Sequence, residues 1–486
     1  MQLREIVRRF AVLSTGALVL VSTAVFAVLP CPYSQPLGLI GYATSVGNHA
    51  LGIDVQGNYA YVGDWNQGSY HAYAGVFQVF DVSDSCNPVR LPGWVETISP
   101  GYNEIGDLAV HENRAYLAND ANGFAVYDIS DPSSPVLLNQ RNDATYAHSV
   151  FYQGGTYAYV GYGWSTNKEL AIYDVSTLPL AAPTIYPTGT GGVHDAYVAG
   201  DRAYVLCGER LDVVDVANPL SPSGISSLAL PQSQYGVEGE VRVQGAYAFL
   251  AMGDAGHVGG LRIIDISHDT NPTLVASYDI PGGAGKMYAK GIGLAVAGDR
   301  AYIAAKGGLW VFDVSSPSSP ALVANYPLPT DFVNSMGAHV EVRDQLAYVT
   351  AYGLTTNDSI GGLAIYKIAN IPYTVQIDIK PGSFPNCFNI NGHGVIPVAI
   401  LGSEDFDVSD VNTESLLFAG MEVRVRGNKG PLCSTEDVNG DSYPDLVCHF
   451  EDQPENWAGG DDTATLQGEL NDGAIIEGHD SICIVP

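Results

Sequence analysis

The feature that most constrains the fold is a seven-fold internal repeat. Each copy reads alanine, then tyrosine or phenylalanine, then an aliphatic residue, and successive copies start 43 to 55 residues apart. This spacing holds four short strands per copy, which is typical of the blades of a β-propeller rather than of helical repeats. The copies, numbered repeats 1 to 7, are Ala60-Tyr61-Val62, Ala115-Tyr116-Leu117, Ala158-Tyr159-Val160, Ala203-Tyr204-Val205, Ala248-Phe249-Leu250, Ala301-Tyr302-Ile303 and Ala347-Tyr348-Val349.

A second motif follows each anchor and carries an aspartate where the chain must turn. An aspartate here suits a side-chain-capped turn between the third and fourth strands of a blade. Because it recurs at every such turn, we assign it a structural role rather than a catalytic one. It reads VFDVS or a close variant at Asp81, Asp128, Asp174, Asp215, Asp265 and Asp313, and degenerates to IYKIA at Lys367.

The last repeat lacks a fourth strand, and the N-terminal segment offers a replacement. Residues from about Pro36 to Tyr42 parallel the fourth strand of repeat 6. Pairing this segment with repeat 7 would close the ring and cover an exposed sheet edge. The expected fold is therefore all-β, with a seven-bladed β-propeller over residues 36–370 that is closed by an N-terminal strand.

The repeats resemble the LVIVD repeats of bacterial and archaeal surface proteins, in which AYVA and GLxVxDVSxPxxP recur. The resemblance covers residues 36 to about 370. It implies a propeller on an exported protein and little about activity.

From Tyr373 onwards the repeat stops, and short apolar runs alternate with Gly, Pro, Asn and Asp. This pattern predicts a second, smaller domain over residues 373–486, folded as a β-sandwich. The segments IDIKPGS, GVIPVAILG and EDVNGD resemble a domain appended to many exported bacterial proteins, and that resemblance implies no activity.

The segment EDVNGDSYPDL in this domain has the spacing of a calcium-binding loop. Oxygen-bearing side chains recur at alternate positions, and Ca²⁺ requires several oxygens that converge on one point. Position 6 is Ser442 rather than Gly and position 12 is Cys448 rather than Glu, so the loop departs from an EF-hand. A solvated acidic turn is the alternative. The predicted ligands are Asp437, Asn439, Asp441, the backbone carbonyl of Tyr443, and Asp445.

The first residues predict export. Arg4, Arg8 and Arg9 precede an apolar run from Phe10 to about Leu29, which is a signal pattern with cleavage expected after Ala27. The expected location is therefore extracellular or at the cell surface. An uncleaved segment 1–27 would instead be an N-terminal membrane anchor. The formal net charge of −31 repels phosphate backbones, so we expect no nucleic-acid partner.

Export makes disulfides plausible for the seven cysteines. Four cysteines lie in the predicted C-terminal domain, and they allow three pairings. Cys433 with Cys448 would hold the calcium-loop hairpin together, which leaves Cys387 with Cys483. Cys31 with Cys86 would lock the ring closure, and Cys207 is expected to be a buried free thiol.

Ionisable residues near the start of each predicted inner strand could converge on the mouth of the central channel. Four imidazoles among carboxylates could bind a transition metal, or act as acid and base on a polar substrate. The alternative is that polar residues are simply required where a wet channel opens. The candidates are His49, Glu104, His148, His194, Glu238, Lys290 and His339, with Asp107, Asp195, Glu240 and Glu341 close by.

The loops between the second and third strands vary in length on the same predicted face, which is how binding sites are usually built on a constant scaffold. Their aromatic residues, Trp65, Tyr70, Tyr73, Tyr162 and Trp164, could stack on sugar rings or pack the loops. We therefore expect a secreted or cell-surface protein that binds a protein or a glycan through this face. The alternative is an extracellular polysaccharide lyase or hydrolase, with or without a metal ion, although the sequence has no GxSxG or HExxH motif.

Overall fold

A computed structural model describes residues 37–485 except 48, 68–72, 99–103, 143–145, 164–167, 190, 231–237, 254–258, 282–291, 333–334, 344, 354–359, 369–372, 384, 390–393, 404–405, 426, 428–429, 454–456, 458–462 and 472–474. The described residues form β-strands and one short 3-10 helix, η1 (Val408–Asp410). Among them, no helix is long and apolar enough to cross a membrane. The predicted signal segment 1–27 lies outside the described residues.

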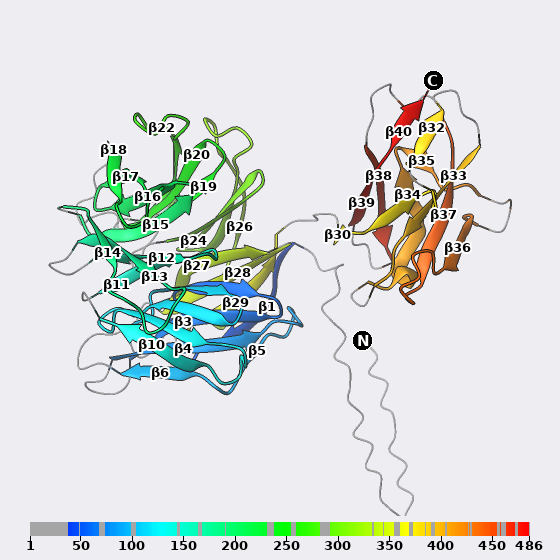
Figure 1. The fold of residues 1–486 in the computed structure, drawn as a ribbon. Coiled ribbons are helices and arrows are strands. Elements are labelled where there is room, and N and C mark those ends of the chain that lie inside the picture. The colour runs from blue at the N-terminus through cyan, green and yellow to red at the C-terminus, as the bar shows by residue number, and fades with distance from the viewer. Residues whose placement is uncertain are drawn as a thin grey trace, which may run out of the picture.

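The repeat region forms a series of antiparallel sheets, one for each repeat (Figure 1). Repeat 1 contains β2 (Ile53–Gln56), β3 (Tyr59–Gln67), β4 (Tyr73–Asp81), β5 (Val89–Arg90) and β6 (Val95–Ile98). Repeat 2 contains β7 (Asp107–His111), β8 (Arg114–Ala118), β9 (Phe124–Asp128) and β10 (Val136–Arg141). Repeat 3 contains β11 (Ala147–Phe151), β12 (Tyr157–Tyr162), β13 (Glu169–Asp174) and β14 (Thr184–Pro187).

The remaining repeats follow the same plan, in which each strand pairs with the next one along the chain. Repeat 4 contains β15 (Val193–Ala199), β16 (Arg202–Cys207), β17 (Arg210–Asp215) and β18 (Ser223–Ala229). Repeat 5 contains β19 (Glu238–Gln244), β20 (Tyr247–Gly253), β21 (Gly260–Asp265) and β22 (Thr273–Asp279). Repeat 6 contains β23 (Gly293–Ala297), β24 (Arg300–Ala305), β25 (Gly308–Asp313) and β26 (Ala321–Tyr326). Repeat 7 contains β27 (Ser335–Arg343), β28 (Leu346–Gly353) and β29 (Gly362–Lys367).

The two sequence motifs of the repeat have the structural roles predicted for them. The anchor alanine and its aliphatic neighbour lie in the second strand of each sheet and are fully buried. The aspartate that ends the third strand accepts a hydrogen bond from the backbone N–H two residues later, which caps the turn as expected. This bond is present at Asp81, Asp128, Asp174, Asp215, Asp265 and Asp313.

The N-terminal strand β1 (Gly38–Thr44) completes the sheet of repeat 7, as predicted. It pairs antiparallel with β29, and Gly38 lies opposite Lys367. A Cβ at Gly41 would collide with the carbonyl oxygen of Ser85, so this strand also packs closely against a turn of repeat 1. The neighbouring Cys86 is disulfide-bonded, and its predicted partner Cys31 lies outside the described residues.

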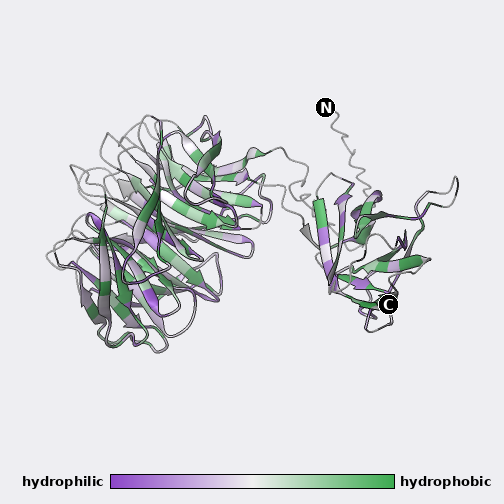
Figure 2. Cartoon of the chain, turned by 90° about the horizontal axis from the view of Figure 1, so that it is seen from above, coloured by the Kyte–Doolittle hydropathy of each residue, from purple (hydrophilic) through white to green (hydrophobic). Residues whose placement is uncertain are grey.

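The first strands of the sheets contact one another in sequence order. Each of β2, β7, β11, β15, β19 and β23 contacts the first strand of the next repeat, and β27 returns to contact β2. Hydrophobic residues fill the spaces between neighbouring sheets: Tyr61 and Phe77 of repeat 1, for example, pack with Leu117 of repeat 2. Figure 2 shows this hydrophobic content along the strands. The arrangement is propeller-like.

The C-terminal region contains two larger sheets and one short strand pair. The first sheet has the order β30 (Tyr373–Thr374), β39 (Ile475–Ser481), β38 (Thr463–Leu470), β34 (Val411–Phe418) and β35 (Met421–Glu422). The second has the order β31 (Ile377–Ile379), β33 (Val395–Ile400), β37 (Asp445–Glu451) and β36 (Cys433–Glu436). The pair is β32 (Cys387–Asn389) with β40 (Cys483–Val485).

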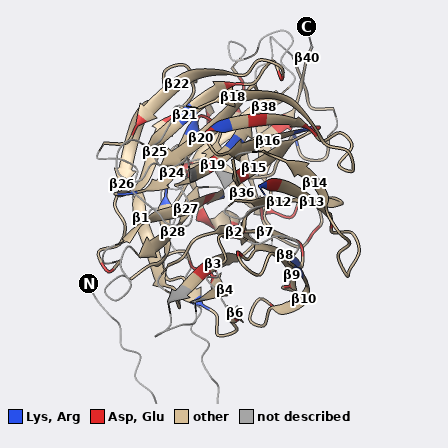
Figure 3. Cartoon of the chain, turned by 90° about the vertical axis from the view of Figure 1, so that its left-hand side faces the viewer, with Lys and Arg blue, Asp and Glu red and all other residues tan. Residues whose placement is uncertain are grey.

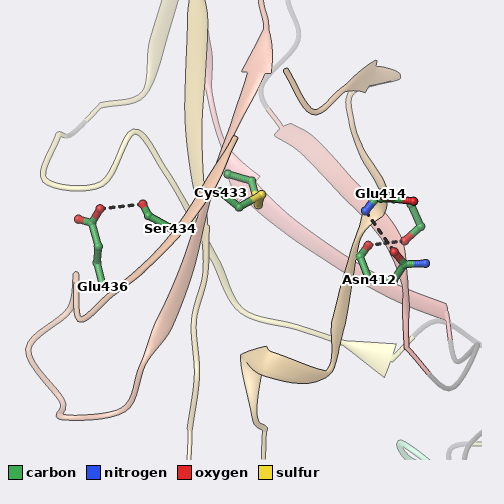
Figure 4. Close-up of a disulfide and its surroundings, with 7 residues drawn as sticks. Asn412, Glu414, Cys433, Ser434 and Glu436 are labelled. Atoms are coloured by element: carbon green, nitrogen blue, oxygen red, sulfur yellow. Dashed lines mark hydrogen bonds between the residues drawn. A yellow bond between two sulfur atoms is a disulfide. The ribbon is translucent and has the colours of Figure 1, made fainter. Parts of the chain in front are cut away.

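Both larger sheets contribute to a single hydrophobic core, in which Phe418 of the first sheet lies next to Phe450 of the second. Two disulfides tie the region together, Cys387–Cys483 and Cys433–Cys448, which selects one of the three pairings that the sequence left open. Figure 4 shows Cys433 on β36. Cys207 is a buried free thiol, also as predicted.

Candidate functional site

One position on each inner strand lies opposite the aromatic residue of the repeat anchor. Because the pairing partner is the same in every sheet, these positions are structurally equivalent. All of them line one cavity of about 420 Å³. They are Asp54, Ala109, Phe151, Tyr197, Arg242, Ala295 and Glu341. We call this set the cavity ring.

The cavity lies toward the end of the inner strands, where each first strand turns into the second. Its lining includes His111, Gln153 and Arg343, which immediately precede these turns or begin them. The volume falls within the range of small-molecule sites in proteins. The predicted binding face, which carries the variable loops, is at the opposite end of the same strands.

The charged members of the cavity ring come from repeats 7, 1 and 5. Figure 3 shows the charged residues along the strands of the chain. Arg343 is half exposed at the rim, where its guanidinium lies 3.2 Å from an Asp54 oxygen and also contacts Glu341. Its Nε donates to the carbonyl of Val55, 3.3 Å away, which ties repeat 7 to repeat 1. The Arg343 guanidinium therefore contacts the carboxyl groups of both Asp54 and Glu341.

A second set of ionisable groups lies two residues before the cavity-ring position on each of four inner strands. These groups are Asp107, Asp195, Glu240 and His339. Arg242 donates to Asp195 at 2.9 Å and to Glu240 at 3.0 Å. His339 Nε2 lies 3.2 Å from Glu240, and its Nδ1 lies 3.9 Å from Asp107. Although burial disfavours its charge, the carboxylates of Glu240, Asp195 and Asp107 raise the pKa of Arg242.

Four of these carboxylates also join neighbouring sheets. Each accepts a hydrogen bond from a backbone N–H on the inner strand of the next repeat, at 2.7 to 2.9 Å. These bonds satisfy buried donors that no strand ladder reaches. The pairs are Asp54 with Val110, Asp107 with Val150, Asp195 with Val241, and Glu240 with Leu294. The carboxylates are therefore held rigidly as part of the scaffold.

Glu341 is a carboxyl group of the cavity ring whose pKa is shifted into the neutral range. Burial raises its pKa to about 8, the Asp54 carboxylate adds to the shift, and Arg343 opposes it. Burial likewise raises the pKa of Asp54. The rim of the cavity therefore carries one carboxyl group that is able to donate as well as accept a hydrogen bond.

This shift predicts the sign of a pH effect on stability. Unfolding returns Glu341 from a pKa of about 8 to its ordinary value of 4.5, so the folded state binds the proton more tightly. The contribution is complete below pH 4.5 and is lost as the pH rises through about 8. We expect the melting temperature to fall between pH 5 and pH 9, and the fall to be smaller in Glu341→Gln. Differential scanning calorimetry would measure both, with exposed Glu112→Gln as the control. Parallel pH profiles for Glu341→Gln and the wild type would contradict this assignment.

The opposite part of the cavity ring is aromatic. Phe151 of repeat 3 and Tyr197 of repeat 4 pack against each other with ring centroids 4.8 Å apart. Both rings are half-buried, and both line the cavity. Ala109 separates this aromatic wall from Asp54 on one side, whereas Arg242 of repeat 5 follows Tyr197 directly on the other side and Ala295 lies between Arg242 and Glu341.

The structure brings one of the seven predicted mouth residues, His339, into this cluster. His49 is buried and packs edge-on against Trp65 and Tyr352, with centroids 4.8 and 4.9 Å away. Glu104 and His148 are buried toward the other end of the strands. His194 is half-buried, and burial lowers its pKa to about 4. The side chain of Glu238 and all of Lys290 lie outside the described residues.

The companion residues predicted beside the mouth lie near one another, but the cavity is at the other end of the strands from the variable-loop face where the mouth was predicted. Asp107, Asp195, Glu240 and Glu341 all belong to the cluster, whereas Asp54, Arg242, Arg343 and the aromatic wall were not anticipated. A sequence signal for the ring exists: in six repeats its member lies six residues before the anchor alanine, and in repeat 3 it lies seven before. Among the described residues, no group of three or more His, Cys, Asp or Glu side chains is placed to hold a metal ion.

The aromatic residues of the variable loops pack within the fold wherever the structure describes them. Trp65 is buried beside His49, and Tyr162 is fully buried with its hydroxyl 2.8 Å from that of Tyr173. Tyr70, Trp164 and the side chain of Tyr73 lie outside the described residues, as do most positions of the loops themselves.

The predicted calcium loop is an exposed turn between β36 and β37. Asp437 accepts from the N–H groups of Gly440 and Ser442, and Asp441 accepts from Tyr443. Ser442 adopts a φ of +76°, the left-handed conformation that glycine usually supplies at position 6 of such loops. The side chains of Asp437, Asn439 and Asp441 are exposed.

Asp445 has a different environment from the other predicted ligands. It is fully buried, and its two oxygens accept hydrogen bonds from Gly402 and Val438, each at 2.8 Å. Asp445 therefore anchors the base of the loop to the neighbouring segment. Calcium binding by the loop stays a prediction.

The protein-family model of the LVIVD repeat matches residues 47–90, 104–143, 190–229, 236–280 and 290–327. The chain thus contains five LVIVD repeats, in repeats 1, 2, 4, 5 and 6, and the resemblance seen in the sequence is confirmed for them. No curated protein matches the chain in sequence.

Several solved structures are similar to this chain. BamB from Moraxella catarrhalis is 10% identical with a TM-score of 0.39, over 66% of this chain and 83% of that one. Periplasmic gluconolactonase PpgL from Pseudomonas aeruginosa is 13% identical with a TM-score of 0.46, over 59% and 87%. Sqt1 from Chaetomium thermophilum is 16% identical with a TM-score of 0.43, over 65% and 83%. No activity or partner is transferred from them.

Proposed function

We propose that the chain is an exported binding protein, secreted or held at the cell surface, whose partner is a protein or a glycan. Its scaffold is a seven-bladed β-propeller closed by β1, followed by a β-sandwich with a calcium-stabilised loop. The disulfides support export, because such bonds persist in oxidising compartments. The variable-loop face remains one proposed contact surface, and the axial cavity is a second.

The observation that carries this proposal is the rigidity of the cavity wall. The carboxylates of Asp107 and Asp195, which line the cavity, are engaged by backbone N–H groups of neighbouring repeats, and Asp195 also pairs with Arg242. Groups fixed in this way form a preorganised recognition surface, which lowers the entropic cost of binding. The arrangement favours holding a ligand over transferring protons to it.

Binding and turnover can be tested in one experiment. The whole protein is exposed to polysaccharides and to glycoproteins before and after enzymatic removal of their glycans, and both retention and released reducing ends are measured. We expect saturable binding without product. The Ala295→Phe variant, which fills the cavity from repeat 6, would show whether the cavity takes part, with Ala321→Phe on outer strand β26 as the control. Absence of binding to every probe would contradict the proposal.

One observation favours the alternative of an extracellular polysaccharide lyase or hydrolase. Glu341 has a pKa of about 8, and both Glu341 and Asp54 contact the Arg343 guanidinium. Enzymes that use acid and base catalysis commonly place a protonated carboxyl group beside a carboxylate. Product formation that Glu341→Gln reduces at least about 100-fold would establish this alternative. A transition metal at the mouth would be detected by metal analysis of the purified protein.

Calcium is expected to stabilise the C-terminal domain. A cation that binds only the folded loop adds about 2.7 kcal/mol at a concentration 100 times its Kd. EDTA should therefore lower the melting temperature of this domain, and Asp441→Ala should abolish the difference because it removes a central ligand. Asp410→Ala, an exposed aspartate outside the loop, should retain it. An unchanged melt with EDTA would remove the calcium prediction.

A further inference from the structure

The cavity ring is divided chemically into two walls. Repeats 3 and 4 contribute Phe151 and Tyr197, while repeats 7 and 1 contribute Glu341 and Asp54 on nearly the opposite side of the ring. Ala109 lies between the walls on one side, and Arg242 followed by Ala295 lies between them on the other. A ligand in this space would meet an aromatic surface on one side and hydrogen-bonding groups on the other.

The charged wall alternates donors and acceptors. The guanidinium groups of Arg343 and Arg242 already donate to carboxylates and backbone carbonyls. Asp54 supplies acceptor oxygens, and protonated Glu341 supplies a donor and an acceptor. Each hydroxyl of a sugar likewise donates one hydrogen bond and accepts others, so a row of hydroxyls is complementary to such a wall. The apolar face of a sugar ring is complementary to an aromatic surface.

Other classes of small ligand fit the cavity less well. Anions such as phosphates would meet the carboxylates of Asp54, Asp107 and Asp195 in the lining. Purely apolar ligands would desolvate both guanidinium groups without replacing their hydrogen bonds. A free cation would find the ionised carboxylates already paired with Arg242 and Arg343.

We infer that the axial cavity binds a neutral sugar residue, whose ring lies on Phe151 and Tyr197 and whose hydroxyls reach Asp54, Glu341 and the two arginines. The sugar is either a free monosaccharide or the end of a glycan chain. This inference rests on the proposed binding function and assigns it a ligand class.

The test is isothermal titration of the whole protein with neutral hexoses and pentoses and with their short oligomers. Ethanolamine and glucuronic acid serve as cationic and anionic probes. Saturable binding of a neutral sugar is expected. Tyr197→Ala should weaken it about 10-fold, which corresponds to about 1.4 kcal/mol and lies at the upper end of what an aromatic contact contributes. Tyr42→Ala, an exposed tyrosine on outer strand β1, should leave the affinity within about two-fold.

The cavity-filling variants Ala295→Phe and Ala109→Phe should abolish binding while they retain the wild-type melting profile, and either one suffices if the other fails to fold. If oligomers bind more tightly than monosaccharides, the sugar bound in the cavity is the end of a glycan chain rather than a free monosaccharide. Binding that survives both variants would overturn the inference, as would binding of ethanolamine or glucuronic acid in place of neutral sugars. A glycoprotein that is still retained after its glycans are removed would support the binding function and count against the sugar.

Discussion

Replacing Asp195 with alanine is expected to lower the free energy of unfolding of the repeat region by about 3–5 kcal/mol, the range measured when one partner of a buried ion pair is removed. Asp195 is buried, accepts from the N–H of Val241 in the next repeat, and pairs with Arg242. Its loss leaves a buried N–H without an acceptor and takes away one of the carboxylates around the guanidinium. Urea denaturation monitored by tryptophan fluorescence would measure the change.

Asp299→Ala is the matched control, because Asp299 is exposed at a turn of repeat 6 and the same charge is removed. Its effect should stay within about 0.5 kcal/mol. The stability loss in Asp107→Ala should resemble that in Asp195→Ala, since Asp107 accepts the equivalent hydrogen bond from Val150 in the next sheet. A loss below about 1 kcal/mol for Asp195→Ala would show that the carboxylate bonds between sheets are not the main support of the inner ring.

The repetitive parts of the fold were predictable because the same local requirement recurs in every repeat. Ala60 and its equivalents must be small where sheets pack, and Asp81 and its equivalents must cap a turn. The closing strand was found because repeat 7 lacks an outer strand that the segment near Tyr42 could replace. The pairing of β1 with β29 confirms that expectation.

The site was less predictable because β-bulges interrupt the inner strands. The register shifts between Ala147 and Ser149 and again between Val193 and Asp195, so His148 and His194 are the extra residues of two bulges. A bulge changes the side to which a side chain points, and no spacing rule for regular strands anticipates it. His339 also lies where a register shifts, and there the shift accompanies its approach to Glu240.

In the predicted calcium loop, too, the spacing of residues did not predict the environment of every side chain. Its spacing treats Asp445 as equivalent to Asp437, yet Asp445 begins a buried strand and binds Gly402, whereas Asp437 lies in the exposed turn. Alternation along a loop predicts which residues bear oxygens. Burial of the strand that follows decides which of these oxygens lie inside the fold and which face solvent.

Removing both cysteines of the Cys387–Cys483 disulfide is expected to lower the stability of the C-terminal domain by more than removing the Cys433–Cys448 pair. The cross-linked residues are 96 apart in the first case and 15 apart in the second. A cross-link restricts the unfolded chain more as the closed loop lengthens, which gives about 4.7 kcal/mol and about 3 kcal/mol, respectively.

Calorimetry on double alanine variants of the full chain would measure the two losses, and the transition of the repeat region supplies an internal reference that should not move. Cys207→Ala tests the loss of a thiol alone, since that cysteine is free and buried. Equal losses for the two disulfides, or a larger loss for Cys433–Cys448, would mean that native contacts between β36 and β37, rather than chain entropy, determine what these bonds contribute.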